Sequence, residues 1–336
     1  MKFYLDVKNL SPDQIRASIL EEPHIRFVSL AGVDMGNNHT DEKIPVREFL
    51  DDMEGFLEKG IQTDGSSVVL PKIAMPYDAR VDLIPDCQVR WYIDYAKCHR
   101  MHNPTLEDEW IGTLVIPSFI YHDGKEVGAR GVLKRAGQEV ERQIKAFFQA
   151  HPETFRSMGI ESLAEIHVNL ATELEFWVES LHVTKDEETL FISQELKEQY
   201  WKRPSGELRK AMEECLMLME AYDLRPEMAH KEVGGVGSRL EGENAYSHME
   251  QIEIDWSYND ALQALDNEFI IKNMVLDVFN RHGLDVTFKA KPIEGVAGSG
   301  EHHHFSFTLI DEKGKKHNLF APAHPEKDYL SPLGYG

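Results

Sequence analysis

Four short stretches of this chain place glutamate or histidine on one side of a predicted strand. They are Glu173–Glu175, Lys231–Val233, Gln251–Ile254 and Gly298–Ser306. Carboxylate oxygens with a little imidazole suit magnesium or manganese better than zinc, which favours closed sets of Cys and His. The four stretches therefore predict a site for divalent metal, and such ions commonly act together with phosphate groups.

The prediction depends on the alternation of side chains along each strand. In residues 166–178 the apolar side chains recur with a period of two, so Glu173 and Glu175 share the opposite face. The same period of two places Gln251, Glu253 and Asp255 on one face of a second predicted strand. It places His302, His304 and Ser306 on one face of a third. A single polar face is usually just solvated. Several acidic faces repel one another unless a cation neutralises them.

Composition indicates a globular chain that acts on small molecules. Of 336 residues, 28% are charged and 42% hydrophobic, which argues against general disorder. Lys and Arg number 36 against 58 Asp and Glu, a net charge of −22 that excludes nucleic acid and anionic membrane surfaces as expected partners. Three cysteines without a CxxC pair, and an N-terminus unlike a signal peptide, predict a cytoplasmic protein.

The order of predicted elements indicates an α+β protein with two domains. Short strands and turns fill about residues 36–130, after a predicted helix at 11–22 and a predicted strand at 26–33. Further helices are predicted from Gly131 to near His151, at 206–222, and from 258 to Gly283. Residues 234–247 are predicted to form a loop. The boundary is expected near residues 118–130.

Seven motifs in a fixed order carry a resemblance to a known family. They are DGSS, then DG followed by Arg130 and LKRA, ELEFW, HKEV, QIEI, KAKP and GSGEHHHFSF. Over about residues 25–335 this order resembles glutamine synthetase of the bacterial type I. The resemblance implies a small N-terminal β-grasp domain at residues 1–118. A catalytic domain with a curved antiparallel sheet flanked by helices would follow at 119–336, incomplete at its C-terminal end.

The resemblance also implies roles for named residues. Glu175, Glu232 and Glu253 would hold one magnesium or manganese ion, and Glu173 and His302 a second. The ATP site would include Glu227, His304 and Ser306, and Gly298 would meet the substrate glutamate through its backbone. Asp64, with Ser67 near it, would serve the ammonium site of a neighbouring subunit.

The implied reaction has two steps and three substrates. ATP phosphorylates the γ-carboxylate of L-glutamate, and ammonia then displaces phosphate to give glutamine. The family assembles homo-oligomeric rings such as a dodecamer, with each active site built between adjacent chains. The resemblance therefore predicts a cytoplasmic, ring-forming ligase of nitrogen metabolism.

Two departures from the family pattern leave other functions open. Val296 and Ala297 stand where the family usually has Asp-Asn, so a γ-glutamyl ligase for a polyamine or alkylamine is an alternative. The sequence also stops at Gly336, before the part of the family that supplies another metal-ligand glutamate, a flap glutamate and several arginines. It is expected to be the front portion of a longer enzyme, and a catalytically incomplete metal- and nucleotide-binding fragment is a second alternative. A metal-dependent hydrolase using His302–His304 fits less well, because hydrolytic zinc sites use more imidazole.

Overall fold

The chain divides into two compact units. The computed structural model describes residues 1–70, 79–98, 109–182, 202–233, 236–239 and 246–335. One unit comprises Met1–Pro152 with Ala261–Leu265, and the other comprises Glu153–Asp260 with Asp266–Gly336. The expected domain boundary between residues 118 and 119 stays a prediction.

The first unit is built on an eight-stranded sheet with the order β1-β6-β7-β2-β3, in which β5 and β8 also pair with β7, and β4 pairs with β5. Strands β2 and β7 run parallel, and the other pairs are antiparallel. Its elements are β1 (Tyr4–Asp6), α1 (Pro12–Leu20), β2 (Ile25–Gly32), β3 (Ile44–Pro45), α2 (Val46–Asp51), α3 (Met53–Lys59), β4 (Ile61–Asp64), β5 (Arg80–Pro85), β6 (Arg90–Cys98), β7 (Glu109–His122), β8 (Lys125–Glu126) and α4 (Ala129–Ala150). The β-grasp assignment stays a prediction.

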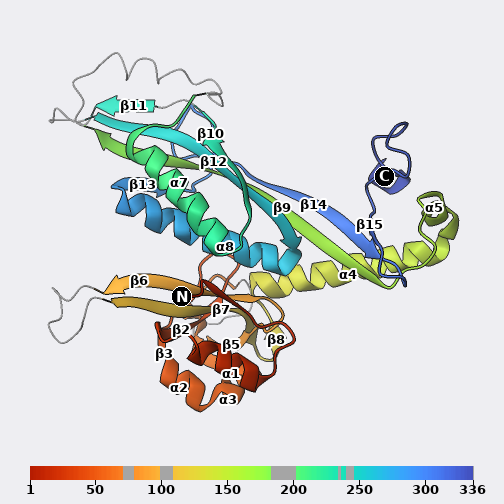
Figure 1. Cartoon of the computed structure of the whole chain (residues 1–336), viewed down its shortest axis with the longest axis horizontal. Coiled ribbons are helices and arrows are strands. Elements are labelled where there is room, and N and C mark those ends of the chain that lie inside the picture. The colour runs from red at the N-terminus through yellow and green to blue at the C-terminus, as the bar shows by residue number, and fades with distance from the viewer. Residues whose placement is uncertain (71–78, 99–108, 183–201, 234–235, 240–245, 336) are drawn as a thin grey trace. The chain divides into compact units, whose positions relative to one another are not determined.

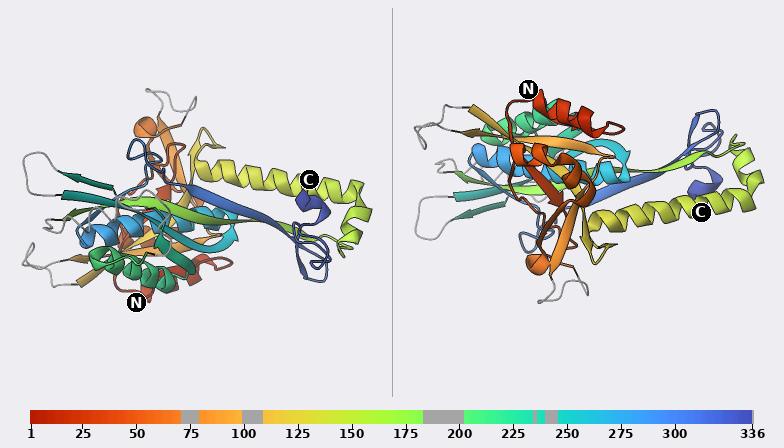
Figure 2. Two further views of the ribbon diagram at one scale, coloured as in Figure 1. Left: turned by 90° about the horizontal axis from the view of Figure 1, so that it is seen from above. Right: turned by 90° about the horizontal axis from the view of Figure 1, so that it is seen from below.

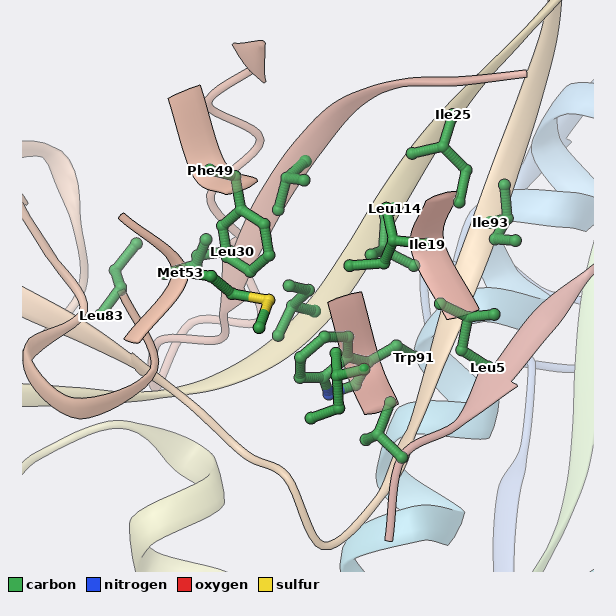
Figure 3. Packing of buried hydrophobic residues seen from close by; sticks show 14 of the residues in the cluster. Leu5, Ile19, Ile25, Leu30, Phe49, Met53, Leu83, Trp91, Ile93 and Leu114 are labelled. Atoms are coloured by element: carbon green, nitrogen blue, oxygen red, sulfur yellow. The ribbon is translucent and has the colours of Figure 1, made fainter. Parts of the chain in front are cut away.

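Helix α1 confirms the helix predicted at residues 11–22, and its start follows from capping. The Ser11 side chain accepts a hydrogen bond from the Gln14 backbone N–H, and the Gln14 side chain accepts one from the Ser11 N–H. Two N–H groups that the first turn would otherwise leave unpaired are thus satisfied. The helix buries Ile15 and Ile19 in the hydrophobic core of this unit, which Figure 3 shows around Trp91.

The second unit is built on a seven-stranded, curled antiparallel sheet with the order β10-β12-β9-β14-β15 (Figure 1), in which β11 also pairs with β12 and β13 with β9. Strand β14 lies beside the first part of β9, where Glu301–Ile310 pair with Glu165–Leu174 (Figure 2). The elements are α5 (Pro152–Ser157), β9 (Glu165–His182), α7 (Gly206–Ala221), β10 (Pro226–Lys231), β11 (Val236–Arg239), β12 (Tyr246–Asp260), α8 (Ala261–Arg281), β13 (Leu284–Thr287), β14 (Glu301–Ile310), β15 (Lys316–Asn318) and α9 (Pro332–Tyr335).

The two faces of this sheet differ in chemistry, as the period-two pattern predicts. Phe176, Ile252 and Ile254 are fully buried on one face, and the ring of Phe176 meets Phe279 of α8 edge to face at 5.5 Å. The alternate positions along β9 and β12 include Glu173, Glu175, Glu253 and Asp255. Burying one face against a helix thus directs the acidic side chains to the other.

The predicted helices at 206–222 and from 258 to Gly283 are confirmed as α7 and α8. Helix α8 begins at Ala261 because β12 continues through Asp260, and Gly283 follows its end with φ of +71°. The loop predicted at 234–247 is wrong in part, since Val236–Arg239 form β11 against β12, which itself begins at Tyr246. The rest of that predicted loop, residues 234–235 and 240–245, lies outside the described residues. Among the described helices, none combines the length and apolar character that crossing a bilayer requires.

We expect Phe279→Ala to destabilise the second unit by about 3–5 kcal/mol, because it leaves a cavity against Phe176. Leu276→Ala, on the exposed side of the same helix, should cost less than about 1 kcal/mol. Urea unfolding followed by circular dichroism measures both, and equal losses would contradict this packing.

Candidate metal centre

Strand register gathers the predicted acidic residues on one face of the second sheet. Glu253 of β12 lies opposite Glu175 of β9 on one side and opposite His230 of β10 on the other. Two residues away along β9, Glu173 lies opposite Asp255 of β12 on one side and His302 of β14 on the other, which makes a second row across the sheet. Residues directly opposite in antiparallel strands point to the same face. The two rows therefore form one acidic surface with imidazoles at its edges.

The three carboxylates predicted to hold one ion come together. Glu175, Glu232 and Glu253 each offer one oxygen, and these three oxygens lie within 4.8 Å of one another. Glu232 directly follows β10, and its backbone N–H donates to the Gln251 carbonyl at 2.9 Å. All three side chains are partly buried, and this oxygen set fits magnesium or manganese. Their action as metal ligands stays a prediction.

Gln251 fixes the position of Glu175 and was not predicted as a site residue. It is completely buried, and its Nε2 donates to Glu175 Oε2 at 2.7 Å and to the Gly298 carbonyl at 2.9 Å. The Gly300 backbone N–H donates to the same Glu175 oxygen at 2.8 Å. Gln251 shares the polar face with Glu253, and that alternation is the signal that could have identified it.

Gly298 is the predicted contact for substrate glutamate, and its position requires glycine. A Cβ atom there would lie 2.4 Å from the Ala290 carbonyl oxygen, well inside any real contact. Its own carbonyl accepts the hydrogen bond from Gln251. The buried amide side chain of Gln251 therefore connects Gly298 to Glu175 by hydrogen bonds.

The residues predicted for the second ion lie beside one predicted for ATP. His302 Nδ1 is 3.4 Å from Glu173 Oε2, and His304 Nε2 is 2.7 Å from Glu173 Oε1. Within the described residues, the three-donor groups are Glu175 with Glu232 and Glu253, His230 with Glu253 and Asp255, and Glu268 with Glu301 and His303. The pair Glu173–His302 belongs to none of these groups, and its metal role stays a prediction.

The other residues predicted for ATP lie on the same sheet. Glu227 is exposed in β10, where the pairing with β12 shifts register, and its Oε1 accepts from Ser257 Oγ at 2.6 Å. Ser306 of β14 accepts from Asn169 Nδ2 at 3.3 Å. Their contact with nucleotide stays a prediction.

Asp64 and Ser67 belong to the first unit, whereas the other predicted site residues belong to the second. Asp64 ends β4 and caps a short 3-10 helix at Gly65–Ser67. Its carboxylate accepts hydrogen bonds from the Ser66 N–H at 2.8 Å and the Ser66 Oγ at 2.9 Å, which hold its pKa below the usual range. The side chain of Ser67 lies outside the described part of the structure.

Burial and the neighbouring carboxylates raise the proton affinity of Glu253, at the centre of the acidic surface. Burial, followed by the charges of Asp255, Glu232, Glu175 and Glu173, raises the pKa of Glu253 to about 8. The basic groups within 4 Å of Glu173 and Glu253 in the described residues are imidazoles rather than Lys or Arg. Either a proton or a metal ion would relieve this repulsion.

Comparison with known proteins identifies the family. Residues 152–335 match the family described as glutamine synthetase, catalytic domain. The chain belongs to the glutamine synthetase family. Glutamine synthetase of Pyrococcus abyssi is 29% identical over 302 residues, which are 88% of this chain and 54% of that protein. This member of the glutamine synthetase family thus spans about half the length of the curated relatives it matches.

Solved structures show the same fold. The cryo-EM structure of Plasmodium falciparum glutamine synthetase has a TM-score of 0.66 and 16% identity, covering 100% of this chain and 59% of that one. A GmaS/ADP complex has a TM-score of 0.55 and 20% identity, covering 90% of this chain and 57% of that one. At these identities the likeness concerns the fold alone.

Metal-free protein should lose stability as pH rises. The folded-state pKa of Glu253 lies above its ordinary value. Its stabilising contribution to the free energy of unfolding is therefore full below about pH 4.5 and is lost as pH rises through about 8. One pKa unit corresponds to about 1.4 kcal/mol, so wild type should lose ~2 kcal/mol or more relative to Glu253→Gln, which mimics the protonated state. Urea unfolding in EDTA measures this, and parallel pH profiles would contradict it.

Gln251→Leu should weaken manganese binding by about 10-fold or more, because Glu175 loses the buried donor that orients it. Isothermal calorimetry measures the affinity, with the exposed Gln143→Leu on α4 as control. Unchanged affinity in the folded Gln251 variant would refute this orienting function.

Proposed function

We propose that this protein contributes to an ATP-dependent ligase that joins ammonia to the γ-carboxylate of L-glutamate, giving glutamine through γ-glutamyl phosphate. The observation that carries the proposal is the convergence of Glu175, Glu232 and Glu253, whose oxygens lie within 4.8 Å of one another in a member of the glutamine synthetase family. Clustered carboxylates on a partly buried surface suit a reaction that brings magnesium or manganese together with phosphate.

In the proposed site the carboxylates have distinct tasks. Glu175, Glu232 and Glu253 hold one ion, and Glu173 with His302 holds a second. Gln251 and the Gly300 N–H orient Glu175 before any ligand arrives. Glu253 gives up the proton that its raised pKa retains. When bound, the ions neutralise charge on the transferring phosphoryl group.

The substrates are assigned to the residues around this cluster. Glu227, His304 and Ser306 contact ATP, and Gly298 contacts glutamate through its backbone. Nucleotide binding is supported by the ADP in the GmaS complex, a protein of similar fold. Asp64 and Ser67 serve the ammonium site of a neighbouring subunit, and the hydrogen bonds that lower the Asp64 pKa keep its carboxylate ionised and suited to a cation.

A second candidate is a γ-glutamyl ligase for another amine, such as an alkylamine or polyamine. Val296 and Ala297 are the observation that favours it, because they replace the Asp-Asn pair of the family beside Gly298. Ala297 is exposed and offers no polar side chain to a substrate. The side-chain contact that the Asp-Asn pair would give the substrate amino acid is then absent, which favours a substrate choice different from that of the standard enzyme.

The protein's setting follows from its charge and family. With a net charge of −22, we infer that it binds neither nucleic acid nor an anionic membrane. We place it in the cytoplasm, as a homo-oligomeric ring with active sites between adjacent chains. If this chain binds ions and nucleotide without turnover, its function is that of a metal- and nucleotide-binding fragment.

Glu232→Gln should abolish manganese-dependent binding of a non-hydrolysable ATP analogue, because it removes a ligand of the first ion. Glu294→Gln, an exposed glutamate of the same unit, should bind as wild type does. Calorimetry with and without manganese measures both. Equal binding by wild type and Glu232→Gln would contradict the proposed centre. Phosphate release from ATP in the presence of glutamate and one of the amines ammonia, ethylamine or putrescine then separates the two candidate functions.

A further inference from the structure

A second three-donor group lies beside the proposed metal position and includes two residues without an assigned task. His230, Glu253 and Asp255 each offer one ligand atom, and these atoms lie within 4.8 Å of one another. His230 of β10 lies opposite Glu253 of β12, and Asp255 follows two residues later on the same face. Glu253 therefore belongs to both groups.

The two ring nitrogens of His230 face different neighbours. The ring is buried, with 7% exposure, and its Nδ1 lies 3.3 Å from the Lys231 carbonyl oxygen and 3.6 Å from Glu232 Oε2. With the proton on Nδ1, where the carbonyl can accept it, Nε2 is the ligand atom, the usual arrangement in protein metal sites. In this structure Nε2 lies on the side of Glu253, 3.9 Å from its Oε1.

Asp255 supplies an independent observation. Its Oδ1 atom is buried and has no hydrogen-bond partner within the described part of the chain. A buried carboxylate oxygen without a donor is costly unless a ligand satisfies it.

A third acidic group shows how such a cluster is satisfied without metal. Glu268 and Glu301, which lie near His303, are bridged by Lys272, whose Nζ is 2.7 Å from Glu268 Oε1 and 3.0 Å from Glu301 Oε2. That group already contains its cation. The group at Asp255 presents an unpaired oxygen instead.

We propose that His230, Glu253 and Asp255 form a separate cation position, next to that of Glu175 and Glu232, which binds manganese or a similar first-row transition ion in preference to magnesium. Imidazole nitrogen favours such ions, whereas the all-carboxylate position accepts magnesium equally well. The inference rests on the proposed function only through Glu253, which bridges the two positions.

The test counts manganese ions bound by the whole chain with MnCl2 as the only added ligand. Calorimetry and the EPR signal of free manganese give the number of sites and their affinities. Asp255→Asn and His230→Gln should each lose one equivalent, or bind it about 10-fold or more weakly. Glu232→Gln should lose a different equivalent, and Glu253→Gln should lose both. Asp277→Asn, on the exposed side of α8, is the matched control.

Two further readouts identify which manganese ion each residue binds. Excess MgCl2 should displace manganese from wild type and leave one equivalent bound, and that equivalent should be absent in Asp255→Asn. Nitrogen coupling in the electron spin-echo spectrum of this remaining ion should persist in His302→Gln and vanish in His230→Gln.

The outcomes separate this inference from the proposed function. If Asp255→Asn and His230→Gln bind manganese as wild type does while Glu232→Gln loses an ion, the separate position is refuted and the first centre stands. If excess MgCl2 displaces all of the bound manganese from wild type, the preference of this position for transition ions is refuted. If wild type binds no manganese, both the inference and the metal-dependent function fail.

Discussion

Repulsion between carboxylates is the constraint on which the second unit depends. Glu173, Glu175, Glu232, Glu253 and Asp255 lie on or beside one face of a single sheet. Burial and the charges of the other four raise the pKa of Glu253 to about 8. Such an arrangement opposes folding unless protons or cations offset it. We therefore regard the stability of this unit and its capacity to bind metal as two results of the same charges.

Apolar packing on the other face of the sheet offsets the repulsion between the carboxylates. Strand β9 pairs with β12 on one side and with β14 on the other, and its apolar face packs Phe176 against Phe279 of α8. The long register between β9 and its neighbours fixes which donors meet. Gln251 then holds Glu175 in place and connects it to Gly298. A rigid strand framework with a buried amide thus orients the carboxylates before a ligand is present.

Alternation along single strands was sufficient to predict which residues share a face. It correctly grouped Glu173 with Glu175, and Gln251 with Glu253 and Asp255. Which strands are neighbours depends on pairings distant in sequence, and period two carries no information about them. For that reason the contact of His230 with Glu253, and the hydrogen bond from Gln251 to Glu175, could not be predicted from spacing. The stretch Lys231–Val233 was among those that predicted a metal site, but the assignment of Glu232 to one particular ion came from the family resemblance. In the structure this residue directly follows β10.

The most direct test of the metal centre is the position of bound manganese. Crystals of this chain grown with manganese, measured near the manganese absorption edge, would show each ion as an anomalous difference peak. The account predicts a peak between the carboxylates of Glu175, Glu232 and Glu253, coordinated by oxygen from all three. Manganese-saturated crystals with no peak there, and with Gln251 still bonded to Glu175, would contradict it.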